Sequence, residues 1–247
     1  MIHRRQSPPR GQGLLEVIIG IGVIIAGTVG SITLISATVT AGRSTNNRVV
    51  AASLARESIE VIRNIRDSNW LAIQANVTGA TSFAGLFNEA AGVRRHFATP
   101  IFDRTNNTWT MNTVGSGAEV LNLDTAFNKD CGVLKCSTVF LDANGYFQKS
   151  GGTAAVNSRF ARMVELHPIC RVDGVAGTPV VIDGIADASY PTETIRSTDR
   201  ATCISSVGTD NEVLVGLQVI ATVRWTEGTT ARNYRLEDRI YNWKYVK

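Results

Sequence analysis

The feature that most constrains this sequence is an apolar run near its start, from Leu14 to Ala41, in which Glu16 is the only charged residue. The run is longer than the roughly 20 residues that a helix needs to cross a bilayer. It is also longer than the apolar core of a secretory signal, about 7–15 residues. We therefore expect it to remain in the mature protein, with the basic stretch MIHRRQSPPR in the cytoplasm and the chain after Arg43 exported.

Two details of this run indicate more than a membrane anchor. A carboxylate such as Glu16 costs on the order of 2.5–3.5 kcal/mol at the middle of a membrane and less toward its surface. The dipole at a helix start recovers only about 0.3–1 kcal/mol, so Glu16 needs a cationic partner. In addition, Gly22, Ala26 and Gly30 follow at intervals of four and form a stripe of small residues, which lets apolar helices approach closely.

The residues around Glu16 resemble the N-terminal signature of type IV prepilins and pseudopilins. The matching pattern is Gly11, a gap of four, Glu16, and an uncharged run from Val17 to Ala41. The resemblance implies that residues 1–11 are a leader peptide and that a prepilin peptidase cleaves between Gly11 and Gln12. It also implies that the new amine of Gln12 is methylated, and that Glu16 pairs with the N-terminal ammonium of a neighbouring subunit in a filament.

The chain departs from this family pattern at two positions. Gln12 stands where the family more often has an aromatic or other apolar residue, and Thr33 stands where it often has proline. Without that proline, a kinked or melted segment near Thr33 is in doubt, although the glycines of the run could still supply local flexibility.

The residues after Arg43 continue the helical pattern but become amphipathic. Apolar residues recur on one side, at Val50, Leu54, Val61 and Ile65. The other side is charged, and Arg56–Glu60 and Arg63–Asp67 lie four residues apart, where they can pair. The sequence therefore predicts one long helix over residues 12–72. Residues 12–42 would lie in a membrane or filament core, and the remainder would pack on a globular head domain, residues 73–247.

The head domain shows its clearest strand pattern at the C-terminus. EVLVGLQVIATVRW reads as an apolar strand, Thr226-Glu227-Gly228 as a turn, and ARNYRLEDRIYNW as the returning strand. A further strand is expected around residue 160, with Phe160, Val164 and Leu166 on one face and Arg162 as the polar exception. Asn144-Gly145 is a strong hairpin turn signal. Residues 73–130 are expected to be a long connecting region with short elements, such as a turn of helix near residues 86–91, and residues 174–202 a surface loop.

These elements predict an α+β fold, in which an antiparallel sheet packs on the amphipathic part of the long helix. The pilin fold would imply the same arrangement. The segments RESIEVIRNIRDSNW and VRWTEG…YRLEDRIYNW also look similar to minor pilins, which is a looser match than that of the N-terminus.

All four cysteines lie in the second half of the chain: Cys131, Cys136, Cys170 and Cys203. In an exported domain, an even number of cysteines predicts disulfides. Three complete pairings are possible, and the spacing favours Cys131–Cys136 with Cys170–Cys203. Free buried thiols are the alternative. A zinc site is disfavoured, because a C-x4-C pair without a matching second pair is not a zinc spacing.

The net charge and the absence of known catalytic motifs restrict the classes of function that the sequence supports. The net charge of +4 comes largely from the N-terminal arginines, so it argues only weakly for nucleic-acid binding. The sequence contains no H-E-x-x-H, G-x-S-x-G or P-loop motif, and we expect neither enzymatic activity nor a cofactor. His167, which precedes Pro168, is expected to be solvated or capped.

Taken with the resemblance, these features predict a structural subunit of a type IV pilus or a related filament, either a minor pilin or a pseudopilin. Its partners would be other pilin subunits, the prepilin peptidase, the pilus assembly machinery and the membrane. It would reside in the cytoplasmic membrane before assembly and in an extracellular filament afterwards. The alternative is a single-pass, membrane-anchored module that binds a surface or DNA outside the cell and does not enter filaments.

Overall fold

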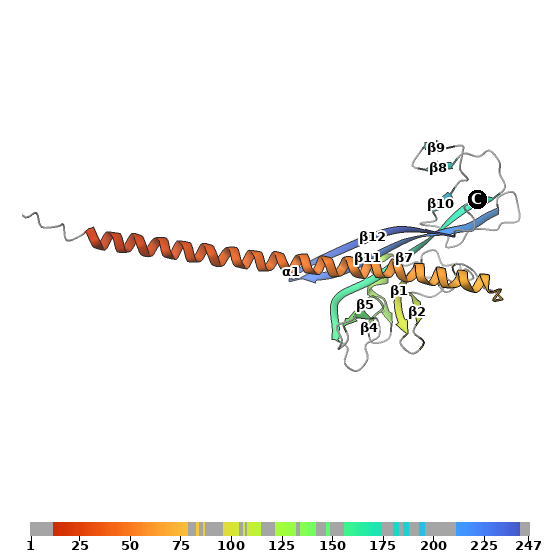
Figure 1. The fold of residues 1–247 in the computed structure, drawn as a ribbon, viewed down its shortest axis with the longest axis horizontal. Coiled ribbons are helices and arrows are strands. Elements are labelled where there is room, and N and C mark those ends of the chain that lie inside the picture. Colours follow the sequence, from red (N-terminus) through yellow and green to blue (C-terminus); the bar gives the residue numbers. More distant parts are fainter. Residues whose placement is uncertain are drawn as a thin grey trace, which may run out of the picture. The chain divides into compact units, whose positions relative to one another are not determined.

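The computed structural model describes fourteen stretches of the chain, and the statements below refer to them. They are residues 12–78, 83, 86, 96–103, 106, 108–114, 122–131, 134–141, 147–148, 156–173, 180–182, 185–187, 193–195 and 211–242. The chain divides into two compact units, Met1–Arg48 and Val49–Lys247. The layout is a long N-terminal helix and a C-terminal antiparallel sheet, so the expected α+β class is confirmed (Figure 1).

Helix α1 runs without interruption from Gln12 to Gln74. Its apolar part contains several hydroxyl side chains, which bond to carbonyls one turn earlier on the same helix and so need no external partner. Thr33 is one of them, because its Oγ1 lies 2.9 Å from the carbonyl oxygen of Val29. The helix therefore continues through the position where a kink was in doubt.

The end of α1 has a clear local cause. Asn76 has a φ of 56°, in the left-handed region that asparagine tolerates better than most residues. The amide of Val77 donates to the carbonyl of Ala72 and that of Asn76 to the carbonyl of Ile73, both at 3.0 Å. These two bonds form a Schellman motif, which satisfies the last carbonyls of the helix. As a result α1 ends two residues beyond the expected position of 72.

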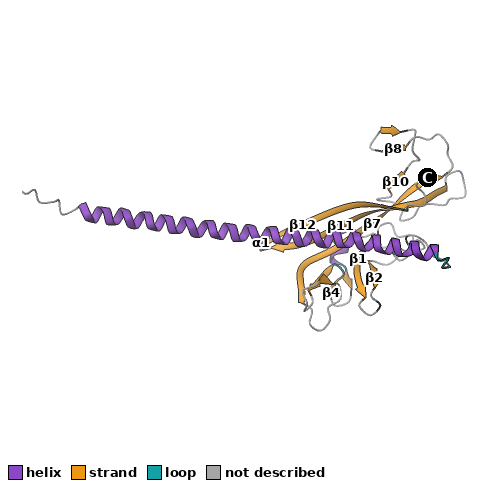
Figure 2. Cartoon of the chain, viewed as in Figure 1, coloured by secondary structure: helices purple, strands orange, loops and turns teal. Residues whose placement is uncertain are grey.

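The main sheet has eight antiparallel strands, and its central path has the order β12-β11-β7-β1-β2 (Figure 2). These five strands are β1 (His96–Asp103), β2 (Thr108–Val114), β7 (Val156–Asp173), β11 (Asn211–Glu227) and β12 (Thr230–Tyr241). Three shorter strands lie off this path: β5 (Thr138–Leu141), β6 (Phe147–Gln148) and β10 (Glu193–Ile195). Two small hairpins are separate, β3 (Asp130–Cys131) with β4 (Leu134–Lys135), and β8 (Val180–Ile182) with β9 (Ile185–Asp187).

The hairpin of β11 and β12 confirms the strongest strand prediction. Its strands pair from Gly216–Tyr241 to Glu227–Thr230, and Gly228 turns the chain with a φ of 61°. Gly216 is needed for a different reason. A Cβ atom at this position would lie 2.9 Å from the carbonyl oxygen of Ile240, so any larger residue would push the two strands apart.

The second part of α1 packs on one face of this sheet. Buried residues of α1 (Ala51, Leu54, Ala55, Ile59 and Ile62) form a core with buried residues of β7 and β11. Phe160, Val164 and Leu166 belong to this core, as their alternation predicts. The opposite face carries a smaller core around Phe97, Phe127 and Met163, which the short helix α2 (Leu123–Asn128) covers.

The structure revises two expectations about connecting segments: the elements within residues 73–130 include two strands of the main sheet, and the surface loop expected over residues 174–202 was wrong. Residues 73–130 contain β1, β2, α2 and β3 as well as connections, and residues 174–202 contain β8, β9 and β10. The turn at Asn144-Gly145 lies outside the described residues. The strands on either side of it, β5 and β6, pair antiparallel, as a hairpin requires.

Candidate functional site

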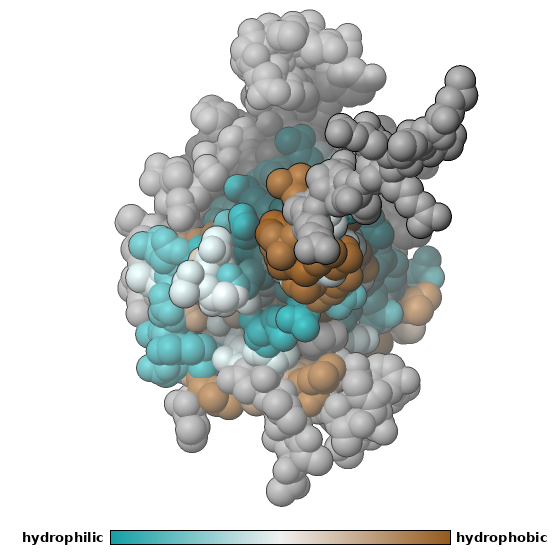
Figure 3. All heavy atoms as spheres, turned by 90° about the vertical axis from the view of Figure 1, so that its left-hand side faces the viewer, coloured by the Kyte–Doolittle hydropathy of each residue, from teal (hydrophilic) through white to brown (hydrophobic). Residues whose placement is uncertain are grey.

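The first candidate site is the apolar surface of α1. Residues 13–43 are all exposed, and most are hydrophobic; Leu14 and Leu34, for example, expose 71% and 68% of their surface (Figure 3). Among the described residues, α1 is the one helix long and apolar enough to cross a membrane. Such a contiguous apolar surface is rare on a soluble monomer and marks contact with a membrane or with other protein surfaces.

Glu16 interrupts this surface near its start. It is exposed, and it lies one helical turn after Gln12, the first residue of α1. Residues four positions apart share one face of a helix. Glu16 therefore lies within the first turn and a half of α1, where a cation at the N-terminal end of a second copy of this helix could pair with it. Gly11, the other half of the expected cleavage site, lies outside the described residues.

The small-residue stripe is also accessible. Gly22, Ala26 and Gly30 are exposed, and a Cβ atom placed on either glycine would meet no other atom within 4 Å. Nothing in the described part of the chain covers this face. The stripe is therefore free to contact another helix.

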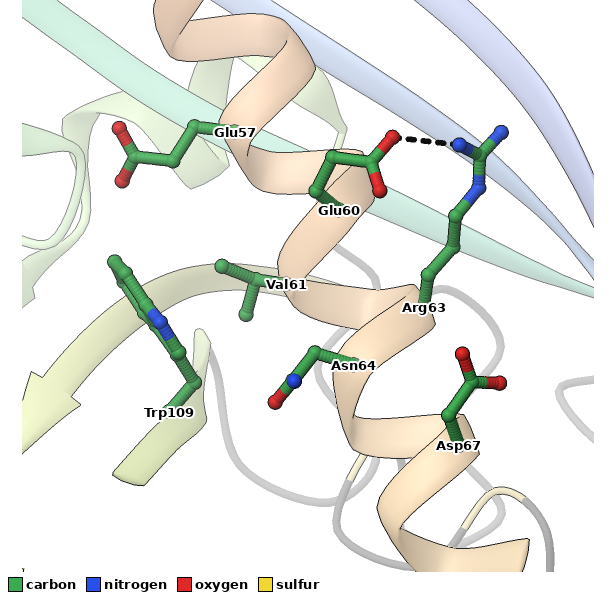
Figure 4. Close-up of a pocket in the computed structure, with 7 residues that line it drawn as sticks. All are labelled: Glu57, Glu60, Val61, Arg63, Asn64, Asp67 and Trp109. Atoms are coloured by element: carbon green, nitrogen blue, oxygen red, sulfur yellow. Dashed lines mark hydrogen bonds and ion pairs between the residues drawn. The ribbon is translucent and has the colours of Figure 1, made fainter. Parts of the chain in front are cut away.

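A second candidate site is a groove of about 440 Å³ between the later part of α1 and strand β2 (Figure 4). Trp109 of β2 forms one wall, and its ring packs against that of Phe102 with centroids 5.0 Å apart. The other wall comes from α1 and is largely polar: Glu57, Glu60, Val61, Arg63, Asn64 and Asp67. An aromatic ring and three carboxylates thus line the same groove, and the Glu60 carboxylate is turned toward Arg63 (Figure 4).

Glu57, at one end of the groove, holds a buried arginine. The side chain of Arg162 on β7 is only 3% exposed, and its Nη1 lies 2.9 Å from Oε1 of Glu57. The same guanidinium donates to the carbonyls of Leu54 and Pro100. Arg162, the polar exception within an apolar strand pattern, therefore links α1, β7 and β1.

Arg63 links α1 to the edge strand β12. Its guanidinium contacts Oδ2 of Asp238 at 2.5 Å and Oε1 of Glu60 at 2.6 Å. The hydrogen bond to Asp238 is the main reason that the pKa of Arg63 is raised above its ordinary value. Since that ordinary value is already far above neutral pH, the stability that comes from the raised pKa of Arg63 is constant through the physiological range and is lost as the pH rises into strong alkali.

The charge pairs on α1 differ from those that sequence spacing suggested. Arg63 bonds Glu60 and Asp238, whereas Asp67 bonds its neighbour Arg66 at 2.8 Å. Arg66 also donates to the carbonyl of Tyr241 at 3.2 Å. Spacing along one helix could not anticipate these contacts, because Asp238 and Tyr241 come from a strand more than 170 positions away.

The disulfide predictions are confirmed in part. Cys131 and Cys136 form a disulfide with Cα atoms 4.9 Å apart, at the hairpin of β3 and β4. Cys170 is also disulfide-bonded. Cys203 lies outside the described residues.

His167 is not solvated, which was one of the two states expected for it, but it does have a bonded partner. His167 is buried within β7, which continues through Pro168 to Asp173, and its Nε2 lies 2.9 Å from Oε1 of Glu165. The two residues lie on the sheet face opposite α1. Within the described ranges, no group of three or more His, Cys, Asp or Glu residues could hold a metal ion.

Sequence reasoning missed the groove. Trp109 lies in a segment with weak periodicity, and nothing in the local sequence indicates that its strand pairs with β1 beside α1. The alternation in TWTMNTV was the available signal: Trp109 and Met111 point toward the helix, while Thr108 and Thr110 are exposed.

No family model, no curated protein and no solved structure matches this chain. We therefore argue its function from the residues and their geometry.

Proposed function

We propose that this chain is a structural subunit of a type IV pilus or a related filament, either a minor pilin or a pseudopilin, assembled through the apolar part of α1. The observation that carries the proposal is the placement of Glu16. It is the only charged residue in an exposed apolar helix surface, and it lies four residues after the expected new N-terminus, Gln12.

The physical reason is charge compensation in an apolar environment. Cleavage after Gly11 would create an ammonium group at the end of an apolar helix. In a filament core of low dielectric constant, leaving either that ammonium or the Glu16 carboxylate unpaired would cost several kcal/mol. Pairing between neighbouring subunits removes both costs and fixes the axial position of one helix against the next.

The layout of the rest of the chain supports this assignment. The later part of α1 packs on an antiparallel sheet. Arg63 and Arg66 of α1 bond to Asp238 and Tyr241 of β12, and Glu57 of α1 bonds to Arg162 of β7. A head fixed to its own helix in this way would be carried into a filament as the helices assemble. Gly22, Ala26 and Gly30 would let neighbouring helices approach closely.

The proposal is tested with Glu16→Val in cells that assemble the filament. We expect the variant to insert in the membrane as the unmodified chain does, because valine lowers the cost of insertion. We also expect it to be missing from sheared filaments, because the ammonium of its neighbour loses its partner. Glu16→Asp, which keeps the charge, is the matched control and should retain part of the incorporation. Normal incorporation of Glu16→Val would contradict the proposal.

A second candidate is a single-pass, membrane-anchored binding module that does not enter filaments. The groove between α1 and β2 favours it, because a groove lined by an aromatic ring and carboxylates is suited to a cationic partner. The two candidates differ in one measurement. An anchored module stays in the membrane fraction when filaments are sheared from the cells, whereas a filament subunit appears with them.

A further inference from the structure

The two edges of the main sheet differ sharply in charge. β12, at one edge, carries five charged residues: Arg232, Arg235, Glu237, Asp238 and Arg239. Charges on an edge strand are a common protection against pairing with other chains. β2, at the other end of the path, has the sequence TWTMNTV, without a charge or a proline. The chain therefore protects one edge and leaves the other chemically open to a further strand.

The start of β2 is also exposed. Thr108 and Thr110 are exposed, and among the described strands β2 pairs with β1 alone. An edge strand presents every second backbone N–H and C=O group outward, where a further strand can bond to them. The far end is less open, because the side chain of Asn112 contacts Cys131. Among the described residues, no strand other than β1 pairs with the segment from Thr108 to Met111, and its two threonines are exposed.

The groove lies beside this edge. Trp109 belongs both to the edge strand and to the groove wall, and its side chain points to the side of the sheet that α1 covers (Figure 4). In a strand added to β2, every second side chain would point to that same side. Those side chains would meet the indole ring and enter the groove, where Glu57 is bonded to the buried Arg162 and Glu60 to the half-exposed Arg63.

The charges of the groove select among possible strands. Its walls carry three carboxylates and one guanidinium, and Glu60 and Asp67 expose 63% and 51% of their side chains. The pair of Glu60 with Arg63 is solvent-exposed, and exposed pairs of this kind are weak, whereas the Arg66 partner of Asp67 is only 13% exposed. A basic side chain entering the groove could share these carboxylates and lie against Trp109, whereas an acidic one would be repelled.

We propose that the free edge of β2 is a docking site for an extended segment of another protein, with lysine or arginine at every second position. Backbone pairing with Thr108–Met111 would supply part of the affinity, and the groove would supply selectivity for basic side chains. This site lies wholly in the unit Val49–Lys247, and the inference does not depend on filament assembly.

The test uses the full chain in detergent micelles and a fluorescently labelled peptide of alternating lysine and threonine, seven residues long. We expect saturable binding, measured by fluorescence anisotropy, and at least about tenfold weaker binding of the matched peptide with glutamate in place of lysine. Equal binding of the two peptides, or no binding of the lysine peptide, would overturn the proposal.

Two controls separate the charge from the strand pairing. Glu60→Lys should lower the affinity for the lysine peptide by about fivefold or more. Glu237→Lys, the same change on the opposite edge strand, should change the affinity for this peptide by less than about twofold. Two further peptides carry N-methyl groups on alternate amides, one on the lysines and one on the threonines. One of them should lose binding, because its methyl groups face β2. If both bind as the unmethylated peptide does, side-chain contacts alone explain the binding and strand addition is excluded.

Discussion

At the scale of single residues, Arg162 does the most to connect the elements of the head. Its nearly fully buried guanidinium bonds Glu57 on α1 and reaches the carbonyls of Leu54 and Pro100. A buried charge of this kind does not by itself add much stability, because desolvation offsets the attraction. We expect it instead to make the packing of α1 on β7 specific, because the buried guanidinium needs the Glu57 carboxylate as its partner.

We expect Glu57→Gln to lower the free energy of unfolding by about 3 kcal/mol, because it leaves Arg162 buried without a counter-charge. The double variant Glu57→Gln/Arg162→Met should recover most of that loss. The measurement is urea unfolding in detergent micelles, followed by tryptophan fluorescence. Glu60→Gln is the matched control: Glu60 is 63% exposed, and we expect a change below about 1 kcal/mol. Equal losses for Glu57→Gln and Glu60→Gln would contradict this role of Arg162.

The Cys131–Cys136 disulfide allows a second prediction at this scale. The bond closes a loop of five positions, for which the chain-entropy relation gives a contribution of about 2 kcal/mol. Cys131→Ala breaks it without removing a buried side chain, because Cys131 is exposed whereas Cys136 is buried. We expect the variant to unfold at lower urea concentration and Cys136 to react with alkylating reagents only after unfolding. An unchanged unfolding midpoint would show that the hairpin is held by its other contacts.

At the scale of elements, the sequence predicted the helices and strands whose hydropathy pattern lies within one continuous segment of the chain. Helix α1 and the β11–β12 hairpin follow from an apolar run, an amphipathic continuation, and alternation around a turn at Gly228. The hairpin of β1 and β2 did not follow, because β1 contains Pro100, which weakens a strand pattern. The groove depends on that hairpin, and so it could not be predicted either.

The accessible stripe on α1 gives a prediction for helix association. We expect Ala26→Leu to weaken association between copies of α1 in lipid vesicles by about fivefold, because the larger side chain keeps the backbones apart. Resonance energy transfer between donor-labelled and acceptor-labelled chains measures this association. Thr28→Leu changes the opposite side of the helix and should have little effect. If the two variants weaken association equally, the stripe is not the contact face.

At the scale of the whole molecule, the chain combines an exposed apolar helix surface with a head that has a buried hydrophobic core and a polar surface. The first part can reside in a membrane or pack with other copies of itself, whereas the second needs water. The sequence predicted this division, because it follows from hydropathy along the chain. The edge of β2 that we propose as a docking site could not be predicted, because it arises only when the strands are placed in order.

The central claim is that Glu16 is half of an ion pair whose other half is made by cleavage. Mass spectrometry of the chain purified from membranes of cells with an active prepilin peptidase tests it most directly. The account predicts an N-terminal peptide that begins at Gln12 and carries one additional methyl group. A chain that still begins at Met1 in those cells would contradict it, because no new ammonium would then exist for Glu16 to pair with.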